Sequence, residues 1–237
     1  MDCARKRANS GRFVVDACLK AILLFGGTFD PVHNGHTAMA NDALEELDAS
    51  ELAIFPAGHP YQRGRLPLAS ALHRTAMLKI AFADTVGASI DSRELERHGP
   101  TFTIDTLREL RQEHGDKAPL TWLVGGDAFA RLDSWRQWQS LFTLANFAVV
   151  LRRSEPHAMG AASAALTLHL ANRQTGARAL VNSAFGKYAV LAANAPPVSS
   201  TQIRARLNAH ESIRGLAPEG VCDYIERYKL YDPEERN

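Results

Sequence analysis

The residues most suited to chemistry lie in one segment, 26–36, which reads GGTFDPVHNGH. Its glycine pair, Gly26 and Gly27, permits a tight turn with accessible backbone N–H groups. His33 and His36 are three residues apart, so if a helix begins here they share one face and point the same way as its free N–H groups. Anions bind at such helix N-termini. The combination predicts a nucleotide site, whereas the glycines alone would indicate only a turn and the histidines alone could be solvated or bind a metal.

A second segment with phosphate-binding chemistry follows the proline pair at 196–197 and spans residues 198–204, which read VSSTQIR. The prolines forbid a helix before this point, and Ser199 or Ser200 can cap the helix that follows. Hydroxyl groups and the planar fork of Arg204 suit phosphate oxygens better than a lysine would. Taken alone, the segment would be a plain N-cap followed by a solvated arginine.

Alternating strand and helix patterns must position these residues. Apolar runs without charges, which are typical of strands buried on both faces, cover residues 21–25, 52–55, 120–124 and 147–151. Helical patterns cover residues 73–83, 103–113, 135–144 and the Ala-rich stretch 158–171. This alternation predicts an α/β fold, a Rossmann-like twisted parallel sheet with helices on both faces and a C-terminal helical segment. The loops after Gly26, Pro56 and Gly125 should meet in one crevice at the carboxyl ends of the strands.

Length and apolar content fit one large α/β domain. The chain has 237 residues, of which 46% are hydrophobic, enough for a sizeable core. We expect residues 19–232 to form a single domain. Residues 1–18 carry several basic side chains before the first predicted strand, and we expect them to be a poorly ordered extension.

Charge and cysteine content exclude several classes of function. Lys and Arg (27) balance Asp and Glu (26), so nothing indicates a surface for DNA or RNA. Cys3, Cys18 and Cys222 are too few and too scattered for a disulfide framework or a zinc site. No apolar segment approaches membrane-spanning length. We therefore expect a cytoplasmic protein without a nucleic-acid or membrane partner, and the oligomeric state stays open, a homo-oligomer included.

The segment 26–36 resembles the signature of the bacterial nicotinate mononucleotide adenylyltransferases, members of the nucleotidyltransferase superfamily marked by a His-x-Gly-His element. The resemblance extends over about residues 20 to 231, and it makes the expected domain a nucleotidyltransferase domain. It also includes the Ser-Ser-Thr-x-Ile-Arg element that grips the triphosphate of ATP. It implies three catalytic residues, His33, His36 and Arg204. For ATP binding it implies Gly26, Gly27, Thr28, Phe29, Gly35, Gly125, Asp127, Ser200 and Thr201.

The middle of the chain carries the implied mononucleotide contacts. Residues 93–107 are similar to the family segment that ends in Thr-x-Asp-Thr-Leu, where backbone amides near Thr103 meet the nicotinate carboxylate. From the residues alone, Thr103 or Asp105 would only cap a helix. Members of the family have an aromatic residue at the position of Trp135, and its ring stacks on the pyridine ring. From the residues alone, Trp135 could instead be a core tryptophan.

Three further positions follow from the resemblance. Residues 122–127 look like the Gly-x-Asp turn beside the nucleotide sugar, and Asp127 could otherwise be a simple turn residue. Arg153 matches a family arginine that reaches a phosphate, although Ser-Glu follows it in place of the usual Pro-Gly. Many relatives read Pro-Pro-His-Lys or Pro-Pro-His-Arg where this chain has Pro-Tyr-Gln-Arg at 60–63. Gln62 therefore replaces the family histidine, which implies an accessory role for that position, and Arg63 remains a mononucleotide phosphate contact.

The residues also indicate how such a reaction would proceed. A phosphate monoester is already an anion at neutral pH, so its attack on the α-phosphorus of ATP needs no general base. Positioning and charge stabilisation must then carry the catalysis, and histidines, glycine amides, hydroxyls and arginines supply them. The sequence offers no obvious acidic cluster for a protein-held metal, so we expect Mg²⁺ to arrive bound to the phosphates of ATP.

The sequence therefore predicts transfer of AMP from ATP to nicotinate mononucleotide, which gives nicotinate adenine dinucleotide and pyrophosphate in NAD biosynthesis. Its expected partners are the small molecules ATP and nicotinate mononucleotide. One alternative is another adenylyltransferase or cytidylyltransferase, such as the phosphopantetheine enzyme, which usually has Thr where His33 stands and lacks the Thr-x-Asp-Thr-Leu segment. The other is a nucleotide sensor without turnover, which would release no pyrophosphate.

Overall fold

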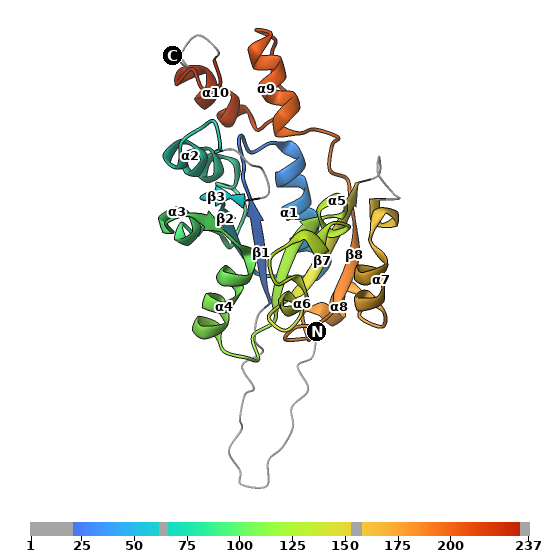
Figure 1. Cartoon of the computed structure of the whole chain (residues 1–237). Helices are drawn as coiled ribbons and strands as arrows, with labels where there is room; N and C mark the ends of the chain where they lie inside the picture. The colour runs from blue at the N-terminus through green and yellow to red at the C-terminus, as the bar shows by residue number, and fades with distance from the viewer. Residues whose placement is uncertain (1–20, 62–65, 153–157, 233–237) are drawn as a thin grey trace.

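The computed structural model describes residues 21–61, 66–152 and 158–232. The expectation for residues 1–18, and the candidate residues Gln62, Arg63 and Arg153, lie outside these ranges. The described residues build a six-stranded sheet with helices on both faces (Figure 1). This arrangement confirms the predicted α/β, Rossmann-like fold.

All six strands of the sheet are parallel, in the order β4-β2-β1-β6-β7-β8. Their bounds are β1 Ile22–Gly27, β2 Glu51–Pro56, β4 Ala88–Ile90, β6 Leu120–Gly125, β7 Asn146–Arg152 and β8 Tyr188–Ala193. The four strands predicted from apolar runs are β1, β2, β6 and β7, and they are confirmed with small shifts at their ends. They are the four inner strands of the sheet, where both faces are buried and an uninterrupted apolar run is expected.

The two edge strands were not identified from the sequence. β4 has only three residues, all of them partly or fully exposed. In β8, buried and exposed residues mix, and Val190 remains 36% exposed. A strand at the edge of a sheet lacks cover on one side, so its apolar pattern is short or interrupted and gives little signal in the sequence.

The helices alternate with the strands and continue beyond them. Their bounds are α1 Asn34–Leu47, α2 Ala71–Ala81, α3 Arg93–Glu96, α4 Thr103–His114, α5 Gly126–Phe129, α6 Trp138–Leu141, α7 Ala164–Leu170, α8 Ala177–Leu180, α9 Ser200–Asn208 and α10 Glu219–Arg227. None of these helices, in the ranges that the structure describes, is long and apolar enough to cross a membrane.

Two predicted helices are wrong in extent. The helix predicted over 135–144 is reduced to α6, because Trp135 has an extended backbone and Gln137 is left-handed, with φ 52°. The helix predicted over 158–171 is split into a 3-10 turn, Ala158–Ala161, and α7. Ser163 caps α7 by accepting a hydrogen bond from the backbone N–H of Leu166, and this cap starts a new helix where an alanine-rich pattern suggests continuity.

Each face of the sheet has its own apolar core. On one face, Leu23 and Phe25 of β1 pack with residues of α1, α2, α8, α9 and α10. On the other face, Leu24 of β1 and Trp122 of β6 pack with residues of α4, α6 and α7. Alternate residues of β1 point to opposite faces, so this strand lies at the centre of both cores.

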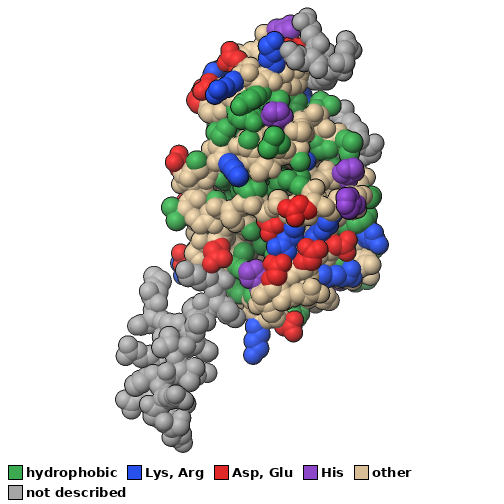
Figure 2. Space-filling view, turned by 90° about the vertical axis from the view of Figure 1, so that its left-hand side faces the viewer, with side chains coloured by type: hydrophobic (Ala, Val, Ile, Leu, Met, Phe, Trp, Pro, Cys, Tyr) green, Lys and Arg blue, Asp and Glu red, His purple; other side chains and the backbone are tan. Residues whose placement is uncertain are grey.

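Two smaller features lie beside the main sheet. The short strands β3, His59–Pro60, and β5, Pro100–Thr101, pair in parallel and form a second sheet. Ion pairs join α3 to α4: Arg93 binds Glu113 at 2.8 Å and Arg97 binds Glu109 at 2.6 Å. Figure 2 shows acidic and basic side chains intermixed on the face that carries these helices. These contacts fix the position at which α4 begins.

Candidate active site

The site starts where β1 ends. A Cβ added at Gly26 would lie 2.3 Å from Cζ2 of Trp122, and one added at Gly27 would lie 2.8 Å from Cζ of Phe29. Close packing therefore requires glycine at both positions. His33 immediately precedes α1 as its N-cap, with an extended backbone, so both histidines enter the first turn of this helix as their spacing predicts.

The two imidazoles stack on each other, with centroids 3.7 Å apart and planes inclined by 23°. His33 is buried, while His36 lines the cavity. The backbone N–H of His33 donates to Nδ1 of His36 at 3.3 Å, which leaves the proton of a neutral His36 on Nε2. The ring of Phe29 meets that of His36 edge-on at 5.0 Å. His36 is thus an Nε2–H donor whose ring is oriented from two sides.

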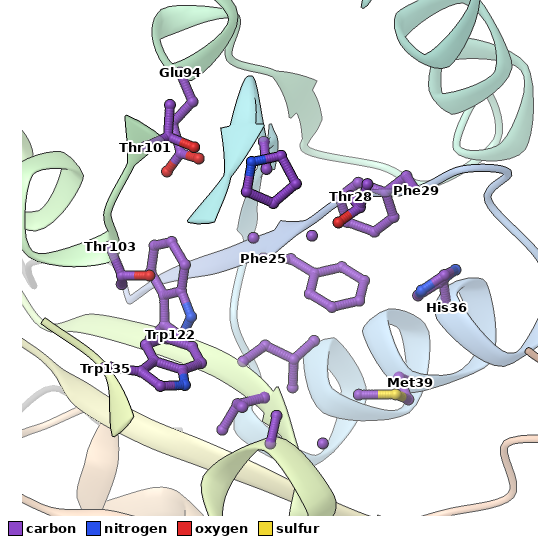
Figure 3. A pocket seen from close by; sticks show the side chains of 18 of the residues that line it. Phe25, Thr28, Phe29, His36, Met39, Glu94, Thr101, Thr103, Trp122 and Trp135 are labelled. Atoms are coloured by element: carbon purple, nitrogen blue, oxygen red, sulfur yellow. The ribbon is translucent and has the colours of Figure 1, made fainter. Parts of the chain in front are cut away.

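A cavity of about 290 Å³ opens at the carboxyl ends of β1 and β6. Figure 3 shows Phe29 and His36 on one side of it, and Thr103, Trp122 and Trp135 on the opposite side. The two sides differ in chemistry, since the first carries Thr28 and a histidine and the second carries two indole rings and a helix start. The cavity therefore has one end suited to phosphate and one suited to a flat ring.

The crevice predicted from the strand pattern is present. Gly26 and Gly125 line the cavity, whereas Pro56 does not and its neighbour Ala57 takes that place. Parallel strands bring their carboxyl ends to one edge of the sheet, so the loops after β1, β2 and β6 meet there.

The cavity brings together ten of the residues predicted for the site: Gly26, Gly27, Thr28, Phe29, His36, Thr103, Gly125, Asp127, Trp135 and Ser200. Four others are described but do not line it: His33, Gly35, Thr201 and Arg204. A Cβ at Gly35 would lie 3.0 Å from Nδ1 of His33 and 3.3 Å from the backbone oxygen of Pro196. Gly35 therefore lets α1 approach the segment before α9.

The helix α9 brings the second phosphate-binding segment to the first. Ser199 is its N-cap and accepts from the N–H of Gln202 at 3.1 Å, while Ser200 Oγ donates to the backbone oxygen of Pro31 at 2.9 Å. Arg204 is buried, and its Nη1 donates to the backbone oxygen of Asp30. A guanidinium bound in this way fixes α9 against the loop between β1 and α1.

A buried polar network surrounds Asp30. Its carboxylate accepts hydrogen bonds from the N–H groups of Leu68 (2.8 Å) and Ala69 (3.0 Å) and from the hydroxyl of Tyr231 (2.9 Å). Arg74 donates to the backbone oxygen of Thr28 at 2.8 Å. Burial lowers the pKa of Arg74, an effect that the negative charge of Asp30 opposes.

This network was not predicted, because its members are far apart in the sequence. Asp30 and Tyr231 are separated by 201 positions. Two buried arginines bind the backbone of the loop between β1 and α1: Arg74 donates to the oxygen of Thr28 and Arg204 to the oxygen of Asp30. The loop that carries Thr28 and Phe29 therefore lies in a locally positive environment, which suits an anionic ligand.

The wall of the cavity includes a buried carboxyl group, that of Glu94. Thr106 Oγ1 donates to its Oε1 at 2.6 Å, and Arg97 donates to the same hydroxyl at 2.8 Å. Burial raises the pKa of Glu94, although the Thr106 hydrogen bond and the charge of Arg97 oppose this shift. A Cβ at Gly58 would lie 2.2 Å from the backbone oxygen of Glu94, so glycine is needed there for β3 to approach α3.

Several cavity residues were missed from the sequence, namely Met39, Tyr61, Glu94, Thr101 and Trp122. Glu94 and Thr101 fall inside the segment 93–107, where the resemblance was already noted. Trp122 lies inside a predicted strand, and only the neighbouring strands show which face it uses.

The residues alone predict that Thr103 or Asp105 caps α4, but the structure shows neither of them in this role. Phe102 is the N-cap and makes no side-chain capping bond. The first N–H groups of α4 therefore lie at the cavity wall without a capping side chain over them.

In the part of the chain that the structure describes, no three His, Cys, Asp or Glu side chains lie together as a candidate metal site.

Known proteins have sequences similar to this one. The family model described as cytidylyltransferase-like matches residues 24–206. A protein of Chromobacterium violaceum, named "Probable nicotinate-nucleotide adenylyltransferase", is 42% identical over 214 residues, covering 88% of this chain and 97% of the relative. A protein of Laribacter hongkongensis with the same name is 40% identical over 215 residues, covering 90% and 96%.

A solved structure shows the same fold. It is the nicotinic acid mononucleotide adenylyltransferase of Plasmodium falciparum complexed with NaAD. It matches with a TM-score of 0.66 at 21% identity, covering 90% of this chain and 97% of that one. Fold and cavity together define a cytidylyltransferase-like nucleotidyltransferase. The chain belongs to the nicotinate-nucleotide adenylyltransferase family, the adenylyl-transferring enzymes of NAD biosynthesis, which confirms the resemblance of residues 26–36.

Proposed function

We propose that the cavity binds ATP and nicotinate mononucleotide side by side and that the mononucleotide phosphate attacks the α-phosphorus of ATP. The bond from the α-phosphorus to the bridging oxygen breaks, and pyrophosphate leaves with that oxygen. The attacking phosphate is already an anion, so no proton must be removed. The observation that carries this proposal is the oriented Nε2–H donor of His36 beside Gly26 and Gly27, in the wall of one cavity with Trp135 and Thr103.

In this reaction the phosphate end of the cavity supplies donors. His36 donates to the α-phosphate as negative charge develops in the transition state, and we propose that the backbone at Gly26 and Gly27, in the wall of the same cavity, shares that role. Ser200 extends the site from α9 toward the triphosphate. His33 and Arg204 act from behind the wall, because each is buried against the groups that it positions.

The opposite end takes the mononucleotide. Trp135 offers a flat face for the pyridine ring, and the start of α4 at Thr103 offers N–H groups and a positive helix end for the nicotinate carboxylate. Asp127 also lines the cavity, and we propose that it contacts the ribose of the nucleotide. Arg153 and Arg63 remain proposed phosphate contacts of the mononucleotide.

We expect Mg²⁺ to enter with ATP. The polar side chains at the phosphate end of the cavity are the imidazole of His36 and the hydroxyls of Thr28 and Ser200, and such groups bind phosphate oxygens. The metal would therefore keep the phosphate and water oxygens that it prefers. It would neutralise charge on the leaving pyrophosphate, while the residues of this chain orient the α-phosphate.

The setting of the reaction follows from its substrates. ATP and nicotinate mononucleotide are small molecules, and the balanced charge of the chain favours no polyanion as a further partner. We propose a cytoplasmic location, where both substrates would be made and used. The oligomeric state stays open.

A coupled assay of pyrophosphate release, run with a panel of mononucleotides and with phosphopantetheine, tests the proposed function. The expected result is release with ATP and nicotinate mononucleotide, in amounts equal to the dinucleotide formed. Pyrophosphate release with phosphopantetheine alone would show that phosphopantetheine, not nicotinate mononucleotide, is the substrate. Binding of both nucleotides without any release of pyrophosphate would show that the protein is a sensor.

A further inference from the structure

The hydroxyl of Tyr61 binds the chain on both sides of Trp135. It donates to the backbone oxygen of Ser134 at 3.3 Å and accepts the backbone N–H of Arg136 at 3.1 Å. Trp135 lies in an extended stretch between a 3-10 turn and the left-handed Gln137. No regular helix includes this stretch, although the backbone of Trp135 bonds to Leu132 and Trp138, and the two hydrogen bonds of Tyr61 add a contact from a distant segment.

The ring of Tyr61 contacts a second part of the same wall. It lies 4.5 Å from the ring of Phe102, centroid to centroid, and Phe102 is the N-cap of α4, directly before Thr103. The guanidinium of Arg136 lies over the ring of Phe102, with Cζ 4.5 Å from the ring centroid. Tyr61, Phe102 and Arg136 therefore join three segments: the residue after β3, the start of α4 and the loop of Trp135.

These three segments enclose the end of the cavity assigned to the mononucleotide. Tyr61, Thr103 and Trp135 all line it, and Figure 3 shows Thr103 and Trp135 on the same side of the cavity. The ATP end does not depend on the same contacts, because His36 and Phe29 are held by α1 and β1.

We propose that Tyr61 is a positioning residue for the pyridine mononucleotide, its hydroxyl holding Trp135 at the distance from the start of α4 that one flat heteroaromatic ring fills. This inference rests on the proposed function, since it names the residue that shapes the mononucleotide end of the same cavity. Proline at this position, as in the family motif Pro-Pro-His, could form neither hydrogen bond. Affinity for the ring should therefore depend on a hydroxyl that never touches the reacting phosphates.

The variant Tyr61→Phe isolates the hydroxyl, because it keeps the ring that packs on Phe102. Loss of one hydroxyl contact of this kind should raise KM for nicotinate mononucleotide about three- to tenfold. The turnover number and KM for ATP should change by less than about twofold, since the interaction is made equally before and during the reaction. Tyr228→Phe, on the exposed side of α10, is the matched control and should leave all three constants unchanged.

Tryptophan fluorescence gives a readout that does not need turnover. Nicotinate mononucleotide added alone to the full chain should quench Trp135, and the same titration of Tyr61→Phe should reach its midpoint at a concentration about three- to tenfold higher. If the midpoint and KM for the mononucleotide both stay within twofold of the unmodified protein, the proposal is wrong. Equal rises in both KM values with a lower melting temperature would also overturn it, because they would show general loosening of the fold.

The outcome can be separated from failure of the proposed function. If the unmodified chain binds nicotinate mononucleotide and releases no pyrophosphate, the reaction is wrong while the fluorescence titration still tests Tyr61. If the unmodified chain does not bind the mononucleotide at all, both the function and the role of Tyr61 are refuted.

Discussion

His36 is one of two stacked imidazoles, and the side-chain contacts around it make it a donor of fixed orientation. Its Nδ1 accepts the N–H of His33, and its ring is packed between His33 and Phe29. A donor already oriented toward the position where charge develops stabilises the transition state without reorganisation. His36 should therefore affect the rate of the chemical step far more than the binding of ATP.

We expect His36→Ala to lower turnover by about two to three orders of magnitude, the usual effect of losing one preorganised donor. The dissociation constant of ATP should change by less than about tenfold, because the interaction belongs mainly to the transition state. Steady-state kinetics and equilibrium binding of ATP measure the two quantities. His98→Ala, at an exposed site, is the control. Near-normal turnover in His36→Ala would leave the residue with only a role in capping α1.

Glu94 gives the stability of the protein a pH dependence. Burial raises the pKa of its carboxyl group in the folded state, so the folded protein holds this proton more tightly than the unfolded chain does. Stability is therefore greatest below the ordinary pKa of glutamate, and it is lost as the pH rises through the raised value. Glu94→Gln keeps an acceptor for Thr106 and removes the titration.

The free energy of unfolding of Glu94→Gln, relative to the unmodified protein, should accordingly increase as the pH rises from about 4 toward neutrality. Urea denaturation at a series of pH values measures this difference. Glu96→Gln, on the exposed side of α3, should show no such trend. A difference that stays constant or falls over this range would contradict a carboxyl group that is preferentially protonated in the folded state.

At the scale of elements, α4 sets the choice between acid and amide. Its first residue, Thr103, lies at the cavity wall, and its N-cap Phe102 covers none of its first N–H groups with a side chain. N–H groups at a helix start are donors, and the local dipole favours an anion. A carboxylate satisfies them, whereas a carboxamide turns its NH₂ toward a donor or leaves one group unpaired.

The protein should therefore prefer nicotinate mononucleotide over the amide by at least about tenfold to a hundredfold in kcat/KM, the discrimination that one unpaired buried group can produce. Steady-state kinetics with both mononucleotides at one concentration of ATP and Mg²⁺ provides the comparison. Equal values of kcat/KM would rule out recognition of the carboxylate by the start of α4.

At the scale of the whole molecule, the last described residues hold the loop between β1 and α1. Tyr231 follows α10, and its hydroxyl donates a hydrogen bond to the carboxylate of Asp30, in the loop between β1 and α1. The same loop is bound by Arg204 from α9 and, at Thr28, by Arg74 from α2. Figure 1 shows α9 and α10 together at one end of the sheet. The C-terminal helices thus form a cover that holds the phosphate loop in place.

Tyr231→Phe should lower the free energy of unfolding by about 1.5–3 kcal/mol, the range for a hydrogen bond to a charged group. Because Asp30 holds the loop that carries Thr28, KM for ATP should rise as well. Urea denaturation and steady-state kinetics measure the two effects. Tyr228→Phe, which removes an exposed hydroxyl, should change stability by less than about 0.5 kcal/mol. No loss of stability in Tyr231→Phe would show that the C-terminal segment does not hold the loop.

Local patterns in the sequence were enough for the parts of this fold that depend on neighbours in the chain. The apolar runs of β1 and β6 are uninterrupted because both strands are central in the sheet. The spacing of Gly26, His33 and His36 predicted the turn from β1 into α1. In the same way, the residues after Pro197 predicted the start of α9 with Ser199 or Ser200 as its cap, and the structure shows Ser199 in this role. Each of these depends on dihedral preferences and spacings within a few residues.

Only the tertiary structure decided the rest, because the contacts involved join distant positions. The resemblance implies that Arg204 binds phosphate, which stays a prediction, and only the folded chain shows that its guanidinium donates to the backbone oxygen of Asp30, 174 positions away. The helix predicted over 135–144 is interrupted at Trp135, whose place is held by Tyr61, more than seventy positions earlier. Glu94 lines the cavity, and ion pairs of Arg93 and Arg97 with α4 hold the helix α3, on which Glu94 lies. The order of strands in the sheet, which no local pattern encodes, determines which of these distant groups meet.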